Sequence, residues 1–367
     1  MAELLKDIYD ADFLRQFGNK IQAVYKPFDV AAFIGMAIED IWDSMTLKAR
    51  VRKITETLGM LLPDCYNEAL AILVGIADEC AGFPYVVFPD FVAVYGQNAG
   101  DWEKSMDALE LFTQKYSAEF AIRPFLLKEP ERVIERMKIW AKHPSEHVRR
   151  FSSEGCRPRL PWGEALPMFK KDPSPVISVL ELLKADPSLY VRKSVANNLN
   201  DISHDNPDAT LETAEHWKGH GPDTDWIIRR GCRTLIRKAN TRAMALFAYE
   251  SAADERPLVG SAEFSVSPLE LAIGERCELQ YTITVRDGEP LHLRLEYGID
   301  FVSTHGRTSR KTFFLSDKTA GGGARLSGRR SHSFENKTTR RHYPGNHRIV
   351  LLVNGQEVAS KTLLITR

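Results

Sequence analysis

The spacing of apolar residues divides the chain into two parts. From the N-terminus onward, apolar residues recur every three or four positions, as in residues 28–45, and this period predicts amphipathic α-helices. After Pro257 apolar and polar residues alternate instead, which is typical of β-strands. We therefore expect a helical-repeat domain over residues 1–256 and a β-domain over residues 257–367.

The β-domain is expected to be a small sandwich. Near its C-terminus, Asn354-Gly355 separates two alternating runs, which is a sequence signal for a β-hairpin. About 110 residues of short strands suit an immunoglobulin-like sandwich. No Cys…Trp…Cys framework occurs in this region, so the prediction concerns the architecture alone.

The helical part contains an internal repeat. Three segments superpose on Val148, Val191 and Ile228, at offsets of 43 and 37 residues, which is the period of two-helix HEAT-type units. A fainter copy, residues 115–124, aligns with residues 150–159. Four related units imply a curved α-solenoid whose concave face is built from the second helix of each unit. The expected fold is thus mainly α: a HEAT-like α-solenoid followed by a C-terminal all-β immunoglobulin-like sandwich.

One column of the repeat is basic. The second position after each aliphatic anchor carries Lys115, Arg150, Lys193 or Arg230. On a concave surface, cations at the repeat spacing can follow a phosphate backbone. The alternative is structural, because such bases can also pair with acids of the neighbouring unit.

Three acids lie on or beside the same face. Glu119, Glu154 and Asp201 fall one or two helical turns after the basic residues. Acids should weaken the binding of a polyanion, whereas carboxylates in such a site can stabilise a developing positive charge or activate water. Helix capping or ion pairing with Lys115 and Arg150 is the alternative.

A helix break follows Glu154. Pro158 and Pro161 end the helix and are expected to hold Trp162 on a rigid turn, where the face of the indole could lie against a sugar or a cation. The alternative is that Trp162 fills a gap between two repeats. The other tryptophans fall in apolar helical patterns and are expected in the core: Trp42, Trp102, Trp140, Trp217 and Trp226.

Composition excludes several classes of protein. Charged residues make up 27% of the chain and hydrophobic residues 43%, as in ordinary globular proteins. No apolar run approaches the ~18 residues of a membrane span, and the acidic N-terminal residues do not resemble a signal peptide. The five cysteines are scattered and form no C-x-x-C pair, so neither a zinc site nor a disulfide framework is indicated. A reducing cytoplasm is expected.

The net charge is zero, but the charges are unevenly distributed. Residues 1–110 contain 18 acids and 9 bases, whereas residues 301–350 contain 11 bases and 2 acids. The glycine-rich stretch 315–347 lacks apolar alternation between Lys318 and Arg330, which predicts a loop that projects from the sandwich. Its arginines could contact phosphates, or the charge could serve solubility alone.

Four segments resemble one known family. They are LKARVRKITETL (47–58), YSAEFAIRPFL (116–126), SSEGCRPRLPW (152–162) and VRKSVANNLNDISHDNP (191–207). These motifs are long and specific, and they are similar to those of the AlkC family of DNA glycosylases, bacterial enzymes that excise alkylated bases. Members of that family with an immunoglobulin-like β tail match the change of pattern near Pro257.

The resemblance implies that the helical repeats cradle duplex DNA, and that the protein removes 3-methyladenine and 3-methylcytosine without fully extruding the base. By motif, Glu119, Glu154 and Asp201 would be the acids at the lesion, with Trp162 beside them. Bases of both domains would contact the DNA: Lys115, Arg149, Arg150, Arg157, Arg159, Lys193, Arg229, Arg230, Arg329, Arg330, Arg340 and Arg341. A monomer in the bacterial cytoplasm, associated with the nucleoid, is expected.

The chemistry of such a lesion agrees with the carboxylates. A base methylated on a ring nitrogen is already cationic, so it leaves without a strong general acid. What remains is to stabilise an oxocarbenium-like sugar and to orient water; an indole face could add ~1–2 kcal/mol. The polar setting of Lys115 and Lys193 does not favour a Schiff base, so a monofunctional enzyme is expected. No metal, other cofactor, membrane partner or apolar pocket for a flipped base is expected.

Two other functions are compatible with the repeats and the bases. One is a HEAT-type scaffold that binds protein or nucleic acid without catalysis, and the other is a structural DNA-binding protein that uses the basic β tail. The scaffold does not explain carboxylates within the cationic column. Release of free base from duplex DNA that contains 3-methyladenine would distinguish the three functions.

Overall fold

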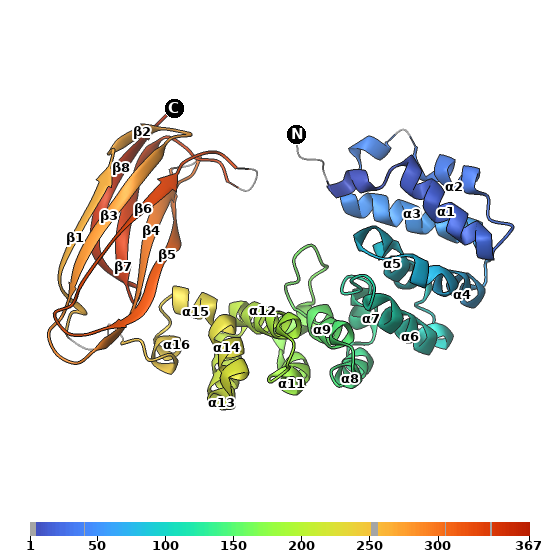
Figure 1. The fold of residues 1–367 in the computed structure, drawn as a ribbon, viewed down its shortest axis with the longest axis horizontal. Helices are drawn as coiled ribbons and strands as arrows, with labels where there is room; N and C mark the ends of the chain where they lie inside the picture. Colours follow the sequence, from blue (N-terminus) through green and yellow to red (C-terminus); the bar gives the residue numbers. More distant parts are fainter. Residues whose placement is uncertain (1–4, 40, 251–255, 305, 338–339) are drawn as a thin grey trace. The chain divides into compact units, whose positions relative to one another are not determined.

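The computed structural model describes residues 5–39, 41–250, 256–304, 306–337 and 340–367. Contacts between residues divide the chain into two compact units, Met1–Gly231 and Cys232–Arg367. Figure 1 shows that the first unit is helical and that the second is mainly β.

The first unit is a succession of helices that pack in two layers. Its α-helices are α1 (Ala11–Val24), α2 (Val30–Ala37), α3 (Leu47–Leu61), α4 (Tyr66–Ile76), α5 (Val87–Tyr95), α6 (Trp102–Thr113), α7 (Arg123–Lys128), α8 (Pro130–Trp140), α9 (Glu146–Gly155), α10 (Pro167–Lys171), α11 (Ser174–Leu183), α12 (Leu189–Asp205), α13 (Pro207–Trp217) and α14 (Pro222–Gly231). Short 3₁₀ helices are η1 (Leu5–Ile8), η2 (Trp42–Ser44), η3 (Ala77–Glu79), η4 (Phe83–Val86) and η5 (Ala99–Asp101). Figure 1 shows α8, α11 and α13 in one layer and α9, α12 and α14 in the other. The predicted HEAT-like architecture is confirmed.

Buried aliphatic residues fix the second helices at the repeat positions. Val148 in α9, Val191 in α12 and Ile228 in α14 are at most 1% exposed, and α12 packs against both α9 and α14. Burying such a side chain stabilises the fold by roughly 1.5–3 kcal/mol. Two positions along a helix correspond to a rotation of about 200°, so Arg150 and Lys193 are turned away from the buried face.

Tryptophan burial largely follows the apolar pattern. Trp42, Trp102, Trp140 and Trp217 are each at most 5% exposed, as predicted. Trp226 is half-buried instead, because it lies on the surface of α14 rather than between helices.

The faint first copy of the repeat has a different backbone from the one predicted. α6 ends at Thr113 and α7 begins at Arg123, so Glu119 lies on a turn and not on the face of a helix. Pro124 lies in the first turn of α7, where its missing N–H costs no helical hydrogen bond, so it favours a helix that begins at this point. The helical stripe predicted for this copy is therefore wrong.

The second unit is a β-sandwich that follows two short helices, α15 (Arg233–Arg237) and α16 (Thr241–Leu246). Its strands are β1 (Val259–Ser267), β2 (Glu270–Ala272), β3 (Arg276–Val285), β4 (Leu291–Val302), β5 (Thr308–Ala320), β6 (Arg325–Ser333), β7 (Gly345–Val353) and β8 (Gln356–Thr366). One sheet has the strand order β1-β3-β6 and the other β2-β8-β7-β4-β5. Neighbouring strands are antiparallel except β2 and β8. Inward-facing residues of both sheets form one apolar core, so the predicted all-β sandwich is confirmed.

The C-terminal hairpin forms where the alternation predicted it. Asn354 and Gly355 connect β7 to β8, and their φ angles are 47° and 82°. Positive φ at both turn residues is adopted readily by Asn-Gly, which explains this pair. The Asn354 side chain accepts a hydrogen bond from the N–H of Arg294 (2.7 Å) and donates one to the carbonyl of His292 (3.1 Å), which fixes the turn to β4.

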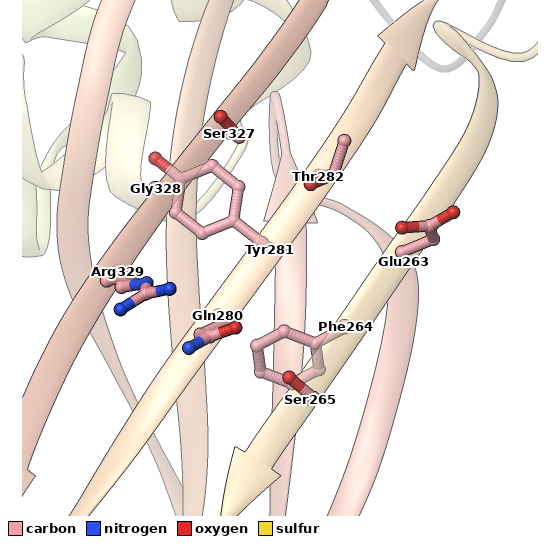
Figure 2. Close-up of a pocket in the computed structure, with 9 residues that line it drawn as sticks. All are labelled: Glu263, Phe264, Ser265, Gln280, Tyr281, Thr282, Ser327, Gly328 and Arg329. Atoms are coloured by element: carbon pink, nitrogen blue, oxygen red, sulfur yellow. The ribbon is translucent and has the colours of Figure 1, made fainter.

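The basic stretch after β5 forms a strand and not the projecting loop that its composition predicted. β6 pairs with β3 along its whole length, from Arg325 to Ser333. β6 has few apolar side chains of its own, and the Tyr281 side chain of β3 covers part of it by lying against Gly328. A Cβ added at Gly328 would meet the phenol oxygen of Tyr281 at 2.5 Å. Figure 2 shows both residues among those that line a pocket formed by β1, β3 and β6. The volume of this pocket is about 440 Å³. The Tyr281 side chain of β3 thus supplies apolar contact that an alternating apolar pattern within β6 would otherwise provide.

Three buried histidines lie in the core of the sandwich. His332, His342 and His347 pack against the rings of Phe301 and Phe334, with ring centres 5.1 to 6.1 Å apart. Burial lowers the pKa of all three imidazoles, and that of His332 to about 4. The folded sandwich therefore resists protonation at these sites.

We expect the β-sandwich to lose stability as the pH falls below about 6.5, the pKa of an unperturbed histidine. Below that value the unfolded chain binds protons that the folded core does not, so acid favours the unfolded state. His332, with its pKa of about 4, would contribute about 3 kcal/mol of this loss by pH 4. Hydrogen-exchange protection of the β4 and β7 amides at pH 7 and pH 5 measures the effect, and equal free energies of opening at both values would contradict it.

Candidate functional site

The three acids singled out in the sequence lie close together in the first unit. Glu119 is on the turn before α7, Glu154 is near the C-terminal end of α9, and Asp201 is toward the C-terminal end of α12. Each is only 6 or 7% exposed. An ionised carboxylate is costly to bury unless it is paired.

Two arginines join these acids into a continuous row. Arg150 donates to Glu119 (Nη1 to Oε2, 3.1 Å), and its Nη2 lies 3.6 Å from Oε1 of Glu154. Arg157 donates to Glu154 (Nη1 to Oε1, 2.6 Å) and, through two nitrogens, to Asp201 (2.8 and 3.2 Å). We call Glu119, Arg150, Glu154, Arg157 and Asp201 the charged row, which alternates three negative and two positive charges.

Close packing of α9 against the turn before α7 brings Glu119 into the charged row. Gly155, the last residue of α9, faces this turn, and a Cβ there would lie 2.8 Å from Cγ2 of Ile122. A larger residue would separate the turn from α9. Because Arg150 and Glu154 are one helical turn apart, both then face Glu119 from the same side of α9.

Polar side chains of α12 hold Glu154 from the opposite side. Ser194 donates through Oγ to Oε2 of Glu154 (2.6 Å) and also contacts the hydroxyl of Ser153 (3.0 Å). Asn198 donates to the carbonyl of Ser153 (2.8 Å). These residues were not predicted as part of the site; the available signal was two polar residues one turn apart among the buried positions of α12.

The electrostatic state of Asp201 depends on Arg157. Burial raises the pKa of the Asp201 carboxyl, whereas hydrogen bonds from Arg157 and its charge act to lower it. The guanidinium therefore helps to keep a buried carboxylate ionised.

A buried arginine supports the loop that follows α9. Arg123 is 1% exposed and donates from Nη1 to the carbonyls of Gly155 and Arg157, both at 3.1 Å, and from Nε to the carbonyl of Glu164. Burial lowers its pKa to about 10. One guanidinium thus ties the start of the loop to its end, a role that the sequence motif did not reveal.

Trp162 stands at the tip of this loop. It has a positive φ of 63° and is 70% exposed, so it does not fill a gap between repeats. A bulky residue with positive φ is strained and persists where its surroundings hold it. The ammonium of Lys48, in α3, donates to the Trp162 carbonyl. Figure 1 shows the loop after α9 standing out from the row of helices.

Arg150 and Arg157 are placed differently from the surface contacts suggested by the sequence. Arg157 is 7% exposed, and its guanidinium is held by Glu154 and Asp201. Arg150 lies over the ring of Tyr190, 5.1 Å from its centre, while it binds Glu119. These positions suit the orientation of carboxylates better than contact with a phosphate.

Other candidate DNA-binding bases of the first unit also pair with acids; Asp186 among these acids is buried, whereas Asp205 and Asp78 are nearer the surface. The pairs are Arg149 with Asp186, Arg159 with Asp205 and Lys115 with Asp78, each at 2.6 Å. Lys193 is exposed on α12, and Arg229 and Arg230 lie in the last turn of α14. Because exposed ion pairs are weak, Lys115 and Arg159 can exchange a carboxylate for a phosphate.

The candidate DNA-binding bases of the second unit lie on or after β6. Arg329, Arg330 and Arg341 are exposed. Arg340 is half-buried, with its guanidinium 4.7 Å from the ring centre of Phe301.

Among the residues that the structure describes, no group of histidine, cysteine, aspartate and glutamate is arranged to hold a metal ion. No single helix of the described chain has the length and apolarity of a membrane span. The helices Leu47–Leu61 and Tyr66–Glu79, which are separated by a bend, reach that length and apolarity only when they are counted together.

Known proteins resemble the chain along its whole length. Residues 260–367 match the family model described as the C-terminal Ig-like domain of the uncharacterised protein YhaZ. The chain is 41% identical over 356 residues to the uncharacterized protein YhaZ of Bacillus subtilis (strain 168), and the match covers 97% of each. It is 37% identical to the alkylpurine DNA glycosylase AlkC of Pseudomonas fluorescens, solved bound to DNA containing an abasic site analog, with a TM-score of 0.92 and full coverage of both chains. The chain therefore belongs to the AlkC family.

Proposed function

We propose that this protein is a DNA glycosylase that excises cationic alkylated bases, chiefly 3-methyladenine and 3-methylcytosine, from duplex DNA. The observation that carries the proposal is the charged row, in which three nearly buried carboxylates meet and whose Glu119 lines one cavity with the exposed Trp162. The full-length similarity to an alkylpurine DNA glycosylase bound to DNA supports it.

The carboxylates act on the sugar rather than on the base. When the C1′–N bond breaks, its electron pair moves to the base and cancels the positive charge there, while the anomeric carbon becomes oxocarbenium-like. Glu119, Glu154 and Asp201 supply negative charge for that carbon, and one of them accepts a proton from the attacking water. Because the cationic base leaves readily, the reaction does not require a strong acid or full extrusion of the base.

Trp162 and the row arginines complete the site. The indole of Trp162 offers a π face to the cationic sugar, which is worth ~1–2 kcal/mol. Arg150 and Arg157 hold the carboxylates oriented before DNA binds, and Arg157 helps to keep Asp201 ionised, so the negative charge needs little reorganisation during the reaction. We assign these arginines a positioning role.

The other candidate bases, which are exposed or half-buried, would bind the DNA backbone. Lys115, Arg149, Arg159, Lys193, Arg229 and Arg230 come from the first unit, and Arg329, Arg330, Arg340 and Arg341 from the second. Phosphate contacts give affinity without sequence preference, as expected for an enzyme that must find lesions in any sequence. We expect the protein to act as a monomer in the bacterial cytoplasm.

Replacement of Arg329, Arg330 and Arg341 by alanine should flatten the dependence of log affinity on log salt. Each lost phosphate contact lowers the slope by about 0.9, so three contacts would lower it by about 2.7. Arg340 is left in place because it packs on Phe301. Fluorescence anisotropy of a labelled duplex at several salt concentrations measures the slope. Lys138→Ala, on α8, is the control, and a triple variant with the slope of that control would contradict a DNA role for these bases.

A duplex annealed from a single strand treated with dimethyl sulfate and its untreated complement tests the proposed substrate class, because N3 of cytosine is methylated when the base is unpaired. We expect mass spectrometry to detect 3-methyladenine and 3-methylcytosine among the released bases, and borohydride to trap no covalent protein–DNA adduct, since the proposed nucleophile is water. Release of no base above the protein-free background would favour the non-catalytic scaffold. A trapped adduct would contradict hydrolysis by water.

A further inference from the structure

A mainly apolar cavity adjoins the charged row within the first unit. It measures about 680 Å³ and lies between α3, α5, the turn before α7 and the loop after α9. Its apolar walls include Leu47, Val51, Val86, Pro89, Phe120 and Pro124. Glu119 and Trp162 also line it, so the cavity opens where the proposed reaction takes place. This differs from the sequence expectation, in which no apolar pocket is present.

The walls of the cavity are tied together across distant segments. Lys48 of α3 donates to the Trp162 carbonyl, and its ammonium lies 5.1 Å from the ring centre of Phe120. One turn further along α3, Arg52 donates two hydrogen bonds to Asp90 of α5, at 3.0 and 2.9 Å. This pairing neutralises both charges, and the remaining lining is predominantly apolar.

Aromatic rings at the cavity remain partly uncovered. Trp162 is 70% exposed, Phe83 is 39% exposed and Phe120 is half-buried. Covering apolar surface is favourable by roughly 25 cal/mol per Å², so a flat apolar occupant would be stabilised there. Small-molecule sites typically measure about 300–1,000 Å³, a range that includes this cavity.

The charge on the leaving base determines which species an apolar cavity accepts. A base methylated on a ring nitrogen is cationic in DNA and becomes neutral when the electron pair of the C1′–N bond moves to it. An undamaged purine would instead depart as an anion unless it were protonated. Apolar surroundings disfavour both the cation and the anion relative to the neutral ring. The cavity therefore matches the base after bond cleavage and not before it.

We propose that this cavity receives the released alkylated base, a neutral planar heteroaromatic ring that lies against Phe120 and Trp162. The inference rests on the proposed glycosylase activity, because that reaction supplies the occupant. Interactions that strengthen as the bond breaks stabilise the transition state more than the ground state. The cavity thus favours lesions whose base leaves without charge, and it requires no extrusion of the intact nucleotide.

Binding of free 3-methyladenine to the protein–product complex tests this assignment. The protein is first saturated with a duplex that carries a stable abasic-site analogue, and radiolabelled 3-methyladenine is then titrated by equilibrium dialysis. We expect one saturable site. Ala49→Leu, which places a larger side chain on the half-buried α3 wall of the cavity, should weaken binding at least tenfold. Ile139→Ala, at an exposed position on α8, is the control and should bind like the wild type.

Three results would overturn the inference. They are no saturable binding up to about 10 mM base, equal affinity of the wild type and Ala49→Leu, and tighter binding of the base to the free protein than to the duplex-saturated protein, which would place DNA in the cavity. If thermal unfolding shows that Ala49→Leu is not folded, Phe120→Leu decides by the same measurement. Failure of the proposed function has a different signature, because the protein would then release no base from methylated DNA.

Discussion

Replacement of Glu154 by glutamine, or of Asp201 by asparagine, is expected to lower the single-turnover excision rate at least tenfold. A tenfold loss corresponds to about 1.4 kcal/mol in the activation barrier. Each amide keeps the size of the side chain and one acceptor oxygen, so it can keep one of the hydrogen bonds from Ser194 or Arg157, but it no longer supplies negative charge to the sugar. Affinity for duplex DNA should hold or increase, because an acid has left a site for a polyanion.

A matched control lies on the same helix as Asp201. Asp205 is also in α12 and is also paired with an arginine, Arg159, but the pair is nearer the surface and outside the charged row. Asp205→Asn should therefore excise at close to the wild-type rate. Wild-type rates for both Glu154→Gln and Asp201→Asn would mean that these acids are structural. Glu119→Gln is measured in the same way.

Replacement of Arg157 by glutamine is expected to reduce excision and to move the acid limb of its pH profile to higher pH. In the proposed mechanism excision requires ionised Asp201, and the fraction that is ionised falls as the pH drops through its pKa. Burial already raises that pKa and Arg157 opposes the rise, so loss of the guanidinium raises it further. The variant should recover much of its activity at alkaline pH, and Arg157→Lys, which restores a charge, should shift the limb less.

The pH profile separates this positioning role from a phosphate contact. If Arg157 bound a phosphate, Arg157→Gln would lower the salt slope by about 0.9 and leave the single-turnover rate at saturating protein unchanged. Arg149→Gln is the control, because Arg149 is also in the α9 region and is bound by two nitrogens to an acid, Asp186. Its pH profile should match the wild type. Removal of one partner of a buried ion pair costs about 3–5 kcal/mol of stability, so each variant is first tested for folding.

The sequence predicted those helices and turns that depend on residues close together in the chain. The apolar period of three to four predicted the helix pairs, and Asn354-Gly355 predicted the last hairpin because positive φ is a property of those two residues. β6 was missed for the opposite reason: Tyr281 of β3 covers Gly328, and the spacing within β6 contains no trace of this contact. Pro124 is consistent with a helix that begins at α7, whereas the alignment with the later repeats predicted a continuous helix through Glu119.

The acids of the site could be read from the sequence, whereas their partners could not. Glu154 and Arg157 are three residues apart, so their contact is local. Arg157 reaches Asp201 only because α9 and α12 pack side by side, which is a tertiary contact. Without knowledge of that contact, the sequence predicts a surface position for Arg157. The cavity beside Trp162 is hidden in the same way, since its walls come from segments more than 100 residues apart in the chain, Lys48 and Trp162 among them.

The most direct measurement of the central claim is the release of free base from a duplex that carries a single 3-methyladenine. The protein is used in excess over the DNA, and the free base and the abasic strand are quantified over time. We predict single-exponential release at least a hundredfold faster than spontaneous loss in the same buffer, the lower end of what positioned acid–base groups contribute, with equal amounts of base and abasic strand. Release no faster than in the absence of the protein, despite saturated DNA binding, would contradict the account.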